Sequence, residues 1–244
     1  MFGKNEVHKP FRAENGSLVV NSIFHTMQGE GPDAGKSAIF VRLTHCNLRC
    51  WFCDTEFSKG DTMTLEELVG QVLQLRDKHR CKLVVITGGE PLLQNIIPFT
   101  AACNVAGMIV SVETAGTLML PNLNLWFKAD RSMHGNLIVC SPKTPRLNEE
   151  LLPLIGAFKY IIRYDSYDPD TGLPIGSTQH KEAAGKHRGK IFAPPRDDER
   201  PIYIQPMDEQ EAVLNRRNLT QAALLALQYN HILSVQLHKL ANLP

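Results

Sequence analysis

Apolar residues along the chain follow two alternating patterns. Short uninterrupted apolar runs are typical of buried strands, and apolar residues spaced three and four apart are typical of helices. The expected strands cover residues 18–24, 38–43, 81–86, 108–112, 125–129, 137–140, 158–163, 201–204 and 234–237. The expected helices cover residues 65–79, 92–104, 149–155 and 209–229. A strand, a helix and a second strand recur in this order, which favours an α/β fold of parallel βα units around an open barrel.

Two of the expected helices carry local signals at their starts. Thr64 and Glu67 form the pattern of a capping box, in which each side chain bonds the backbone of the other residue. Pro98 lies inside the second expected helix, where it either starts the helix or kinks it.

The length of the chain allows one sizeable core, and barrels of this length are commonly a single domain. Residues 1–17 carry charges without an apolar pattern, so we expect a flexible or draped N-terminal arm. Residues 18–244 are expected to form one domain, with a polar insertion at about 164–200 that mixes prolines with charges. Extension into solvent is the default for such an insertion. The alternatives are that it covers the active site or docks a reductant.

Charge and composition exclude several classes of function. The formal net charge is +1 and no basic patch dominates, so phosphate contacts to a nucleic acid have no electrostatic support. No apolar run approaches about 18 residues, and the first ten residues lack the apolar segment of a signal peptide. We therefore expect a cytoplasmic protein with no nucleic-acid or membrane partner. Six cysteines, three of them clustered, suit a reducing compartment.

Cys46, Cys50 and Cys53 lie within eight residues, directly after the expected strand 38–43. Structural zinc sites usually have four ligands, and the other three cysteines form no second pair. His45 offers a fourth zinc ligand, so zinc stays an alternative. Three thiolates leave one iron of a [4Fe–4S] cluster open to bind a cofactor, and we favour this interpretation.

Polar residues interrupt or follow several of the apolar runs. Arg42 lies in an apolar strand, where an unpaired charge is costly, so it needs either an internal salt bridge or a carboxylated substrate. Gln28 and Glu30 belong either to a plain turn or to a segment that approaches a flat ligand closely. Glu113 ends a strand and either caps the next turn or accepts from ribose hydroxyls.

The cysteine segment and its flanks resemble a known family. Cysteines spaced CxxxCxxC after a strand are the signature of the radical S-adenosylmethionine (SAM) enzymes. Three further segments narrow the resemblance: Thr26-Met27-Gln28-Gly29-Glu30-Gly31, Phe40-Val41-Arg42-Leu43 and Cys53-Asp54-Thr55. Together with Pro244, they resemble the 7-carboxy-7-deazaguanine synthase family of 7-deazapurine (queuosine) biosynthesis. The similarity runs from about residue 20 to the end, with one insertion.

The resemblance implies a modified, incomplete (β/α) barrel of the radical SAM type, with the active site at the carboxyl ends of its strands. It implies three cofactors, a [4Fe–4S] cluster, SAM and Mg²⁺, and an electron donor such as flavodoxin or ferredoxin. The expected reaction converts 6-carboxy-5,6,7,8-tetrahydropterin to 7-carboxy-7-deazaguanine with loss of ammonia, through a radical derived from SAM. A homodimer is expected on the same ground.

The resemblance also assigns residues to these groups. Cys46, Cys50 and Cys53 are expected to hold the cluster. Thr55 is expected to bind Mg²⁺ with the substrate carboxylate, although a turn or cap hydroxyl is its alternative. The expected SAM contacts are Phe52, Cys53, Asp54, Gly89, Glu113, Ser141, Pro142, Lys143, Gln205, Pro206, Met207 and Asp208. The expected substrate contacts are Met27, Gln28, Gly29, Glu30, Arg42, Thr87 and Pro244. For Pro244 the contact is its free carboxylate, which offers two acceptor oxygens to the N–H edge of a pterin.

Two other functions stay open. One is a radical SAM activase that places a radical on a partner protein, with the insertion as its docking arm. The other is a non-enzymatic module for metal binding or electron transfer, with zinc or a closed cluster.

Overall fold

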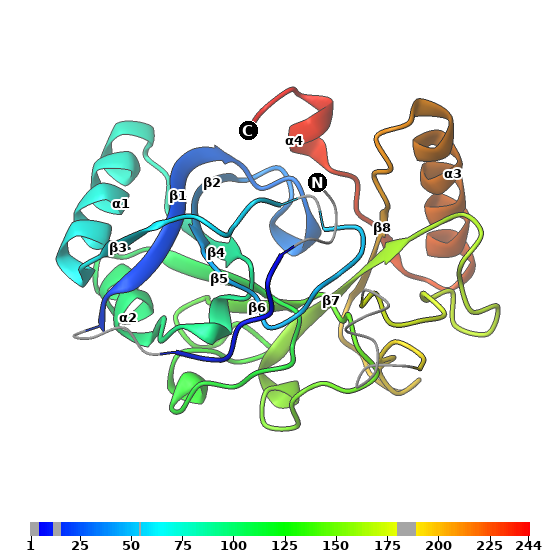
Figure 1. The fold of residues 1–244 in the computed structure, drawn as a ribbon, viewed down its shortest axis with the longest axis horizontal. Coiled ribbons are helices and arrows are strands. Elements are labelled where there is room, and N and C mark those ends of the chain that lie inside the picture. Colours follow the sequence, from blue (N-terminus) through cyan, green and yellow to red (C-terminus); the bar gives the residue numbers. More distant parts are fainter. Residues whose placement is uncertain (1–4, 12–15, 54, 180–188) are drawn as a thin grey trace.

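One nine-stranded sheet forms the centre of the computed structural model, which describes residues 5–11, 16–53, 55–179 and 189–244 (Figure 1). The strand order is β3-β1-β2-β4-β5-β6-β7-β8-β9. The strands are β1 (Leu18–Met27), β2 (Ser37–Leu43), β3 (Asp61–Met63), β4 (Leu83–Gly88), β5 (Ile109–Thr114), β6 (Leu137–Cys140), β7 (Ile155–Ile162), β8 (Ile202–Pro206) and β9 (Ile232–Leu233). All neighbours from β2 to β9 are parallel, whereas β1 is antiparallel to β2 and to β3. The sheet is not closed, which confirms an incomplete α/β barrel.

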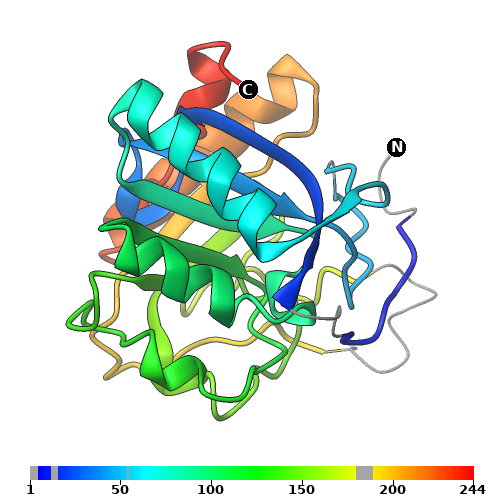
Figure 2. The ribbon, with the colours of Figure 1, turned by 90° about the vertical axis from the view of Figure 1, so that its left-hand side faces the viewer.

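Four α-helices accompany the sheet in the part of the chain that the structure describes. They are α1 (Leu65–His79), α2 (Ile97–Val105), α3 (Ala212–Gln228) and the short α4 (Leu237–Leu240). Figure 2 shows α1, in cyan, and α2, in green, side by side across one face of the sheet. α3 packs on β7, β8 and β9 at the other end. None of the described helices is long and apolar enough to cross a bilayer.

The alternation of side chains along β2 decides which residues face the core and which face the inside of the open barrel. Ile39, Val41 and Leu43 are fully buried in the main core, which the helices complete. Phe40 and Arg42, which alternate with them, line a cavity on the opposite face. Because side chains alternate between the faces of a strand, this apolar run of the sequence places a charged residue inside the barrel.

The first expected helix is confirmed, including its capping box. The backbone N–H of Glu67 donates to the Thr64 hydroxyl (3.2 Å), and the Thr64 N–H donates to the Glu67 carboxylate (2.8 Å). The second expected helix begins later than predicted, at Ile97, because Pro91–Leu93 forms a 3₁₀ turn. Pro98 lies in the first turn of α2 and therefore starts this helix rather than kinking it.

The expected strand at residues 125–129 is wrong. Leu123–Leu125 is a 3₁₀ turn, after which Phe127 buries its side chain completely in the core. The side-chain amide of Asn136 donates to the Trp126 carbonyl (2.9 Å) and holds the segment as a covering loop. Since β5 and β6 pair directly with each other, no strand fits between them.

The expected helix at residues 149–155 is also wrong. Only Leu152–Leu154 is helical, as a 3₁₀ turn, and Ile155 already pairs with Ile138 of β6 as the first residue of β7. Pro153 has no N–H to donate, so it does not support a longer helix across this segment.

The last expected strand, residues 234–237, is wrong as well. The strand at this end of the chain is β9, which stops at Leu233. Beyond it, Ser234 N–H still donates to the Ile204 carbonyl of β8 (2.9 Å), but the segment then bonds the loop after β1: Gly31 N–H donates to the Ser234 hydroxyl (2.9 Å) and Leu237 N–H donates to the Gly29 carbonyl (3.1 Å).

Candidate active site

A cavity of about 670 Å³ lies at the carboxyl ends of the parallel strands. Its lining comes from β1, β2, β4, β5, β7 and β8, from the residues that follow β6, from the cysteine loop and from the C-terminal segment. The carboxyl ends of parallel strands are where α/β folds place their binding sites, because the loops there converge on one rim. The cavity therefore collects polar residues that lie far apart in the sequence.

Cys46, Cys50 and Cys53 all line this cavity from the loop after β2. Within the described ranges, no three or more His, Cys, Asp or Glu side chains are arranged to hold a single metal ion. A [4Fe–4S] cluster makes a different demand, since each cysteine ligand binds a separate iron atom. Three thiols that open on one cavity fit that demand. Burial raises the pKa of Cys46 well above its usual range, and a bound metal would favour the thiolate form of this side chain.

His45, the proposed fourth zinc ligand, does not line the cavity. Its ring contacts the rings of His8 (4.2 Å between centroids) and Phe11 (5.3 Å), and its Nδ1 lies 2.6 Å from the Thr44 hydroxyl. These contacts hold the ring against the N-terminal arm. His45 is therefore not placed to act as the fourth ligand of a zinc ion.

The cysteine loop is held by backbone bonds to the segment that follows β4. Gly89 N–H donates to the Leu43 carbonyl (3.1 Å), and Glu90 N–H donates to the His45 carbonyl (2.8 Å). A Cβ atom on Gly89 would lie 1.8 Å from the His45 carbonyl oxygen, so only glycine permits this approach. Gly89 also lines the cavity.

Two segments outside the barrel also bond the cysteine loop. From the N-terminal arm, His8 N–H donates to the Cys46 carbonyl (2.8 Å). From the insertion, the Thr178 carbonyl accepts from Trp51 N–H (3.1 Å), and the Gln179 side chain accepts from Arg49 N–H (3.0 Å).

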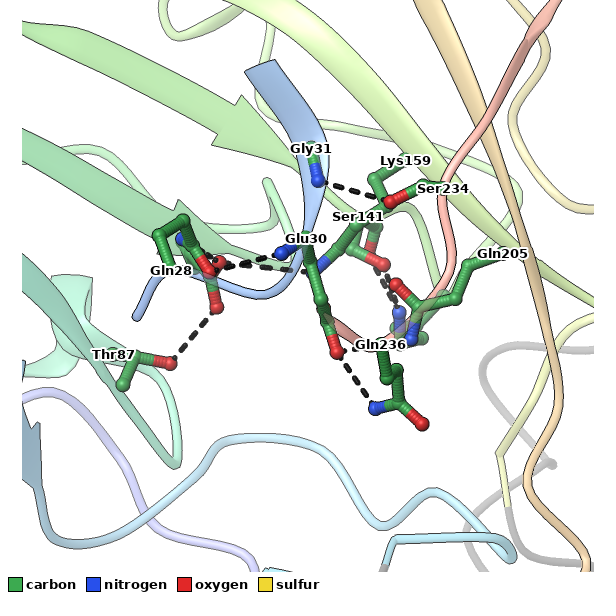
Figure 3. Close-up of polar contacts among 11 residues, drawn as sticks. Gln28, Glu30, Gly31, Thr87, Ser141, Lys159, Gln205, Ser234 and Gln236 are labelled. Carbon is green, nitrogen blue, oxygen red and sulfur yellow. Dashed lines mark hydrogen bonds and ion pairs between the residues drawn. The ribbon is translucent and has the colours of Figure 1, made fainter. Parts of the chain in front are cut away.

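A lysine between two carboxylates occupies the part of the cavity shown in Figure 3. Lys159, from β7, is buried, contacts Glu30 directly and lies 3.7 Å from Glu113. Glu113 accepts in turn from the Gln28 amide (3.0 Å) and the Thr87 hydroxyl (3.2 Å). Burial by itself lowers the pKa of Lys159, but the two carboxylates outweigh it and the net shift is upward. The ammonium charge is therefore retained inside the cavity.

Glu30 is the most heavily bonded carboxylate of this cluster. Besides Lys159, it accepts from the Gln236 amide (2.7 Å) and the Gln205 amide (3.1 Å), which Figure 3 shows converging on it. Burial raises the pKa of Glu30, but Lys159 and the hydrogen bond from Gln236 overcome that effect and lower it from 4.5 to about 2. Glu30 is thus a carboxylate at neutral pH.

The C-terminal segment covers one side of the cavity. Pro244 lines the cavity, and one of its oxygens accepts from the Thr26 hydroxyl (3.0 Å). His238 also lines the cavity, and a Cβ on Gly29 would lie 2.0 Å from its Nδ1. Gly29 therefore makes room for His238 and does not itself face the cavity.

Arg42 faces the cavity, and no carboxylate of the described residues forms an ion pair with it. Its Nε is buried and forms no hydrogen bond within the described residues, and its guanidinium lies 5.5 Å from the centre of the Phe24 ring. The internal salt bridge considered for Arg42 is absent from the described part of the chain. A second buried atom, Oε1 of Gln205, also forms no hydrogen bond there. A donor and an acceptor thus remain available to a ligand.

Ser141 and Lys143, at the carboxyl end of β6, line the same cavity. The Lys143 ammonium group donates to the Ser141 carbonyl (3.1 Å) and lies 6.0 Å from the centre of the Phe52 ring. Burial lowers the pKa of Lys143. Lys143 is thus a half-buried cavity residue and not the exposed lysine that its residue type suggests.

The structure brings most of the predicted site residues into this one cavity. Those that line it are Cys46, Cys50, Cys53, Thr55, Phe52, Gly89, Glu113, Ser141, Lys143, Gln205, Pro206, Met207, Asp208, Met27, Gln28, Glu30, Arg42, Thr87 and Pro244. Gly29 and Pro142 are not among the lining residues. Asp54 lies outside the described residues.

Sequence reasoning missed Lys159, Gln236 and His238, all of which line the cavity. Lys159 had a usable signal, because it interrupts the apolar run of β7 just as Arg42 interrupts that of β2. Gln236 and His238 had none, since they reach the cavity only through the fold of the C-terminal segment.

The chain is similar to known proteins in sequence and in fold. A family model described as the radical SAM superfamily matches residues 41–156. A 7-carboxy-7-deazaguanine synthase from Rhodospirillum rubrum is 40% identical, over 98% of this chain and 98% of that protein. A protein of the same name from Rickettsia prowazekii is 34% identical, over 98% of this chain and 94% of that protein. The crystal structure of QueE from Escherichia coli is 22% identical, with a TM-score of 0.60 over 90% of this chain and 94% of that chain, and has the same fold.

Replacing Gly89 with alanine should displace the cysteine loop, because the new Cβ would meet the His45 carbonyl at 1.8 Å. We expect Gly89→Ala to bind much less iron and sulfide than wild type after anaerobic reconstitution. Its free energy of unfolding should be about 1–3 kcal/mol lower than that of wild type. Gly70→Ala in α1 is the matched control, because a Cβ there meets nothing within 4 Å. Full iron and sulfide content in Gly89→Ala would contradict this account of the loop.

The lowered pKa of Glu30 predicts a specific acid sensitivity. Its folded pKa of about 2 lies below its unfolded value of 4.5, so its contribution to stability is complete above pH 4.5 and is lost as the pH falls toward 2. Wild type should therefore have a higher free energy of unfolding in urea than Glu30→Gln at pH 6. This difference between the two proteins should be smaller at about pH 3. Glu66→Gln, at an exposed position of α1, controls for general loss of charge. A gap that does not change with pH would contradict the assignment.

Proposed function

Because the chain belongs to the 7-carboxy-7-deazaguanine synthase family of radical SAM enzymes, we propose that its substrate is 6-carboxy-5,6,7,8-tetrahydropterin. The enzyme acts in 7-deazapurine biosynthesis, and the product of the proposed conversion is 7-carboxy-7-deazaguanine, formed with loss of ammonia. The alternatives of a protein activase and of a non-enzymatic metal module find no support in the named relatives.

The observation that supports the substrate proposal is that the buried Nε of Arg42 has no hydrogen-bond partner among the described residues. The Arg42 guanidinium faces the same cavity as the three cysteine thiols. A buried donor of this kind is costly unless a ligand satisfies it. A substrate carboxylate matches the planar guanidinium in charge and in geometry. We assign Arg42 to that carboxylate.

The other polar groups of the cavity suit the edge of a pterin. Such an edge presents several N–H donors, and carboxylates and amide oxygens are their acceptors. Gln28, Glu30, Thr87 and the Pro244 carboxylate are assigned to this edge. Glu113 accepts from Gln28 and Thr87, so we assign it to the substrate side of the cavity as well as to the SAM ribose.

The opposite side of the cavity is assigned to the cofactors. Cys46, Cys50 and Cys53 would hold a [4Fe–4S] cluster, which together with SAM supplies one-electron reductive chemistry when bound. The residues assigned to SAM on the family pattern are Phe52, Cys53, Asp54, Gly89, Ser141, Lys143, Gln205, Pro206, Met207 and Asp208, whereas Pro142 does not line the cavity and is not assigned. The role of the protein is to hold the substrate in one orientation and to keep water out, for which the C-terminal segment provides a cover.

Several parts of the assignment rest on the family alone. An electron donor such as flavodoxin or ferredoxin, a homodimeric state and a cytoplasmic location stay predictions.

The proposal is tested by an anaerobic assay of the reconstituted enzyme with dithionite, SAM, Mg²⁺ and the carboxytetrahydropterin, following 7-carboxy-7-deazaguanine by mass. We expect product in excess over the SAM consumed. Arg42→Met should lower kcat/KM roughly 10- to 100-fold through loss of a charged hydrogen-bonded contact, with cluster content unchanged. Arg216→Met, at an exposed position of α3, is the matched control. Formation of 5′-deoxyadenosine without any deazaguanine would retain the radical chemistry and reject the substrate.

Thr55 is assigned to Mg²⁺, because hydroxyl and carboxylate oxygens are the ligands that this hard ion prefers and Thr55 lines the cavity. Thr55→Ala is expected to lose most of the stimulation of turnover by Mg²⁺ while it retains iron and sulfide. Thr55→Ser, which keeps the hydroxyl, should restore the stimulation. An unchanged Mg²⁺ dependence in Thr55→Ala would remove the assignment.

A further inference from the structure

The insertion contacts the cysteine loop at one sulfur. The Thr178 hydroxyl lies 3.2 Å from Cys50 Sγ, and the Gln179 side-chain amide nitrogen lies 3.4 Å from the same atom. Thr178 and Gln179 are both buried. Two side chains from a segment more than a hundred residues further along the chain therefore meet at a single expected iron ligand.

The orientation of the Gln179 amide follows from its other contact. Its Oε1 accepts from the backbone N–H of Arg49 at 3.0 Å. Since the oxygen is used there, the NH₂ group is the part of the amide that faces Cys50 Sγ. An isolated antiparallel bridge between Cys50 and Gln179 holds the two backbones together.

The Thr178 hydroxyl has one alternative acceptor, the Lys143 carbonyl at 3.4 Å. That carbonyl already accepts from Thr178 N–H (3.1 Å) and from the Ser177 hydroxyl (3.0 Å), which occupy its two lone pairs. A cysteine that binds iron is a thiolate, and a charged acceptor attracts a donor more strongly than a neutral one. The hydroxyl proton therefore points to the sulfur in the metal-bound enzyme.

We propose that Thr178 and Gln179 are positioning residues that donate hydrogen bonds to the Cys50 thiolate and raise the reduction potential of the cluster. Reduction adds one electron and makes the cluster more negative, so donors to its ligand sulfur stabilise the reduced form more than the oxidised form. The insertion thereby favours acceptance of an electron from the reductant. The inference rests on the proposed cluster site and is independent of the pterin assignment.

The test is a redox titration of the reconstituted protein with dithionite, in which the reduced cluster is followed by electron paramagnetic resonance. The double variant Thr178→Val/Gln179→Met is expected to lower the equilibrium constant for one-electron reduction about tenfold, which is ~59 mV in the negative direction. Each single variant should give part of this shift. Thr178→Ser keeps the hydroxyl and should retain the wild-type potential.

Ser177→Ala is the control for loss of a neighbouring hydroxyl: this hydroxyl bonds the Lys143 carbonyl (3.0 Å) and accepts from Gln179 N–H at 3.4 Å, but within the described residues it forms no hydrogen bond with the sulfur. Its potential should equal that of wild type. Iron and sulfide are measured for every variant; if Gln179→Met reduces them, Thr178→Val, which keeps the Gln179 amide, decides the question. If Thr178→Val and the double variant bind full iron and sulfide and have the wild-type reduction potential, the inference is overturned. The proposed cluster site would not be affected by that result. A wild-type chain that binds no iron and sulfide would instead overturn the cluster site and the inference with it.

Discussion

The buried ammonium group of Lys159 is the interaction on which the arrangement of the cavity depends. It comes from β7, near the middle of the parallel strands, and contacts Glu30 from the loop after β1 and Glu113 from the end of β5. None of these charges is tolerable inside the protein by itself, because a charge without a partner loses its hydration with no compensation. Their common satisfaction requires the middle of β7, the end of β5 and the loop after β1 to lie together, with Gln236 of the C-terminal segment placed against Glu30.

The cysteine loop is subject to a second constraint. It is a polar segment without a hydrophobic core, so hydrogen bonds from other segments must hold it in place. It obtains its hydrogen bonds from the end of β4, where Gly89 allows the backbones to approach, from the N-terminal arm through His8, and from the insertion through Thr178 and Gln179. The arm and the insertion have the weakest apolar patterns of the chain. Their described residues nevertheless supply backbone and side-chain partners that the loop needs.

These two constraints divide the cavity into parts with different chemistry. Three thiols open on it from one loop, and most of the charged and amide groups face it from the strands and the C-terminal segment. Arg42, whose buried Nε has no partner in the described protein, belongs to the charged part. A radical SAM enzyme needs this combination, because its metal cofactor and a polar substrate must share one space from which water is kept out.

The sequence by itself determined the parallel α/β class, the capped helix α1 and the three clustered thiols, and the short motifs that resemble a known family named most of the site residues that the cavity brings together. These features depend on local patterns and short motifs, which a chain carries whatever its tertiary structure. The sequence did not show that residues 125–129 form a covering loop or that Ile155 begins a strand, because an apolar run reveals burial but not the element that buries it. The contacts of Lys159 with Glu30 and of Thr178 with Cys50 were decided by the tertiary structure alone. Each joins residues more than a hundred positions apart, and only the closing of the open barrel and the docking of the insertion bring them within hydrogen-bond distance.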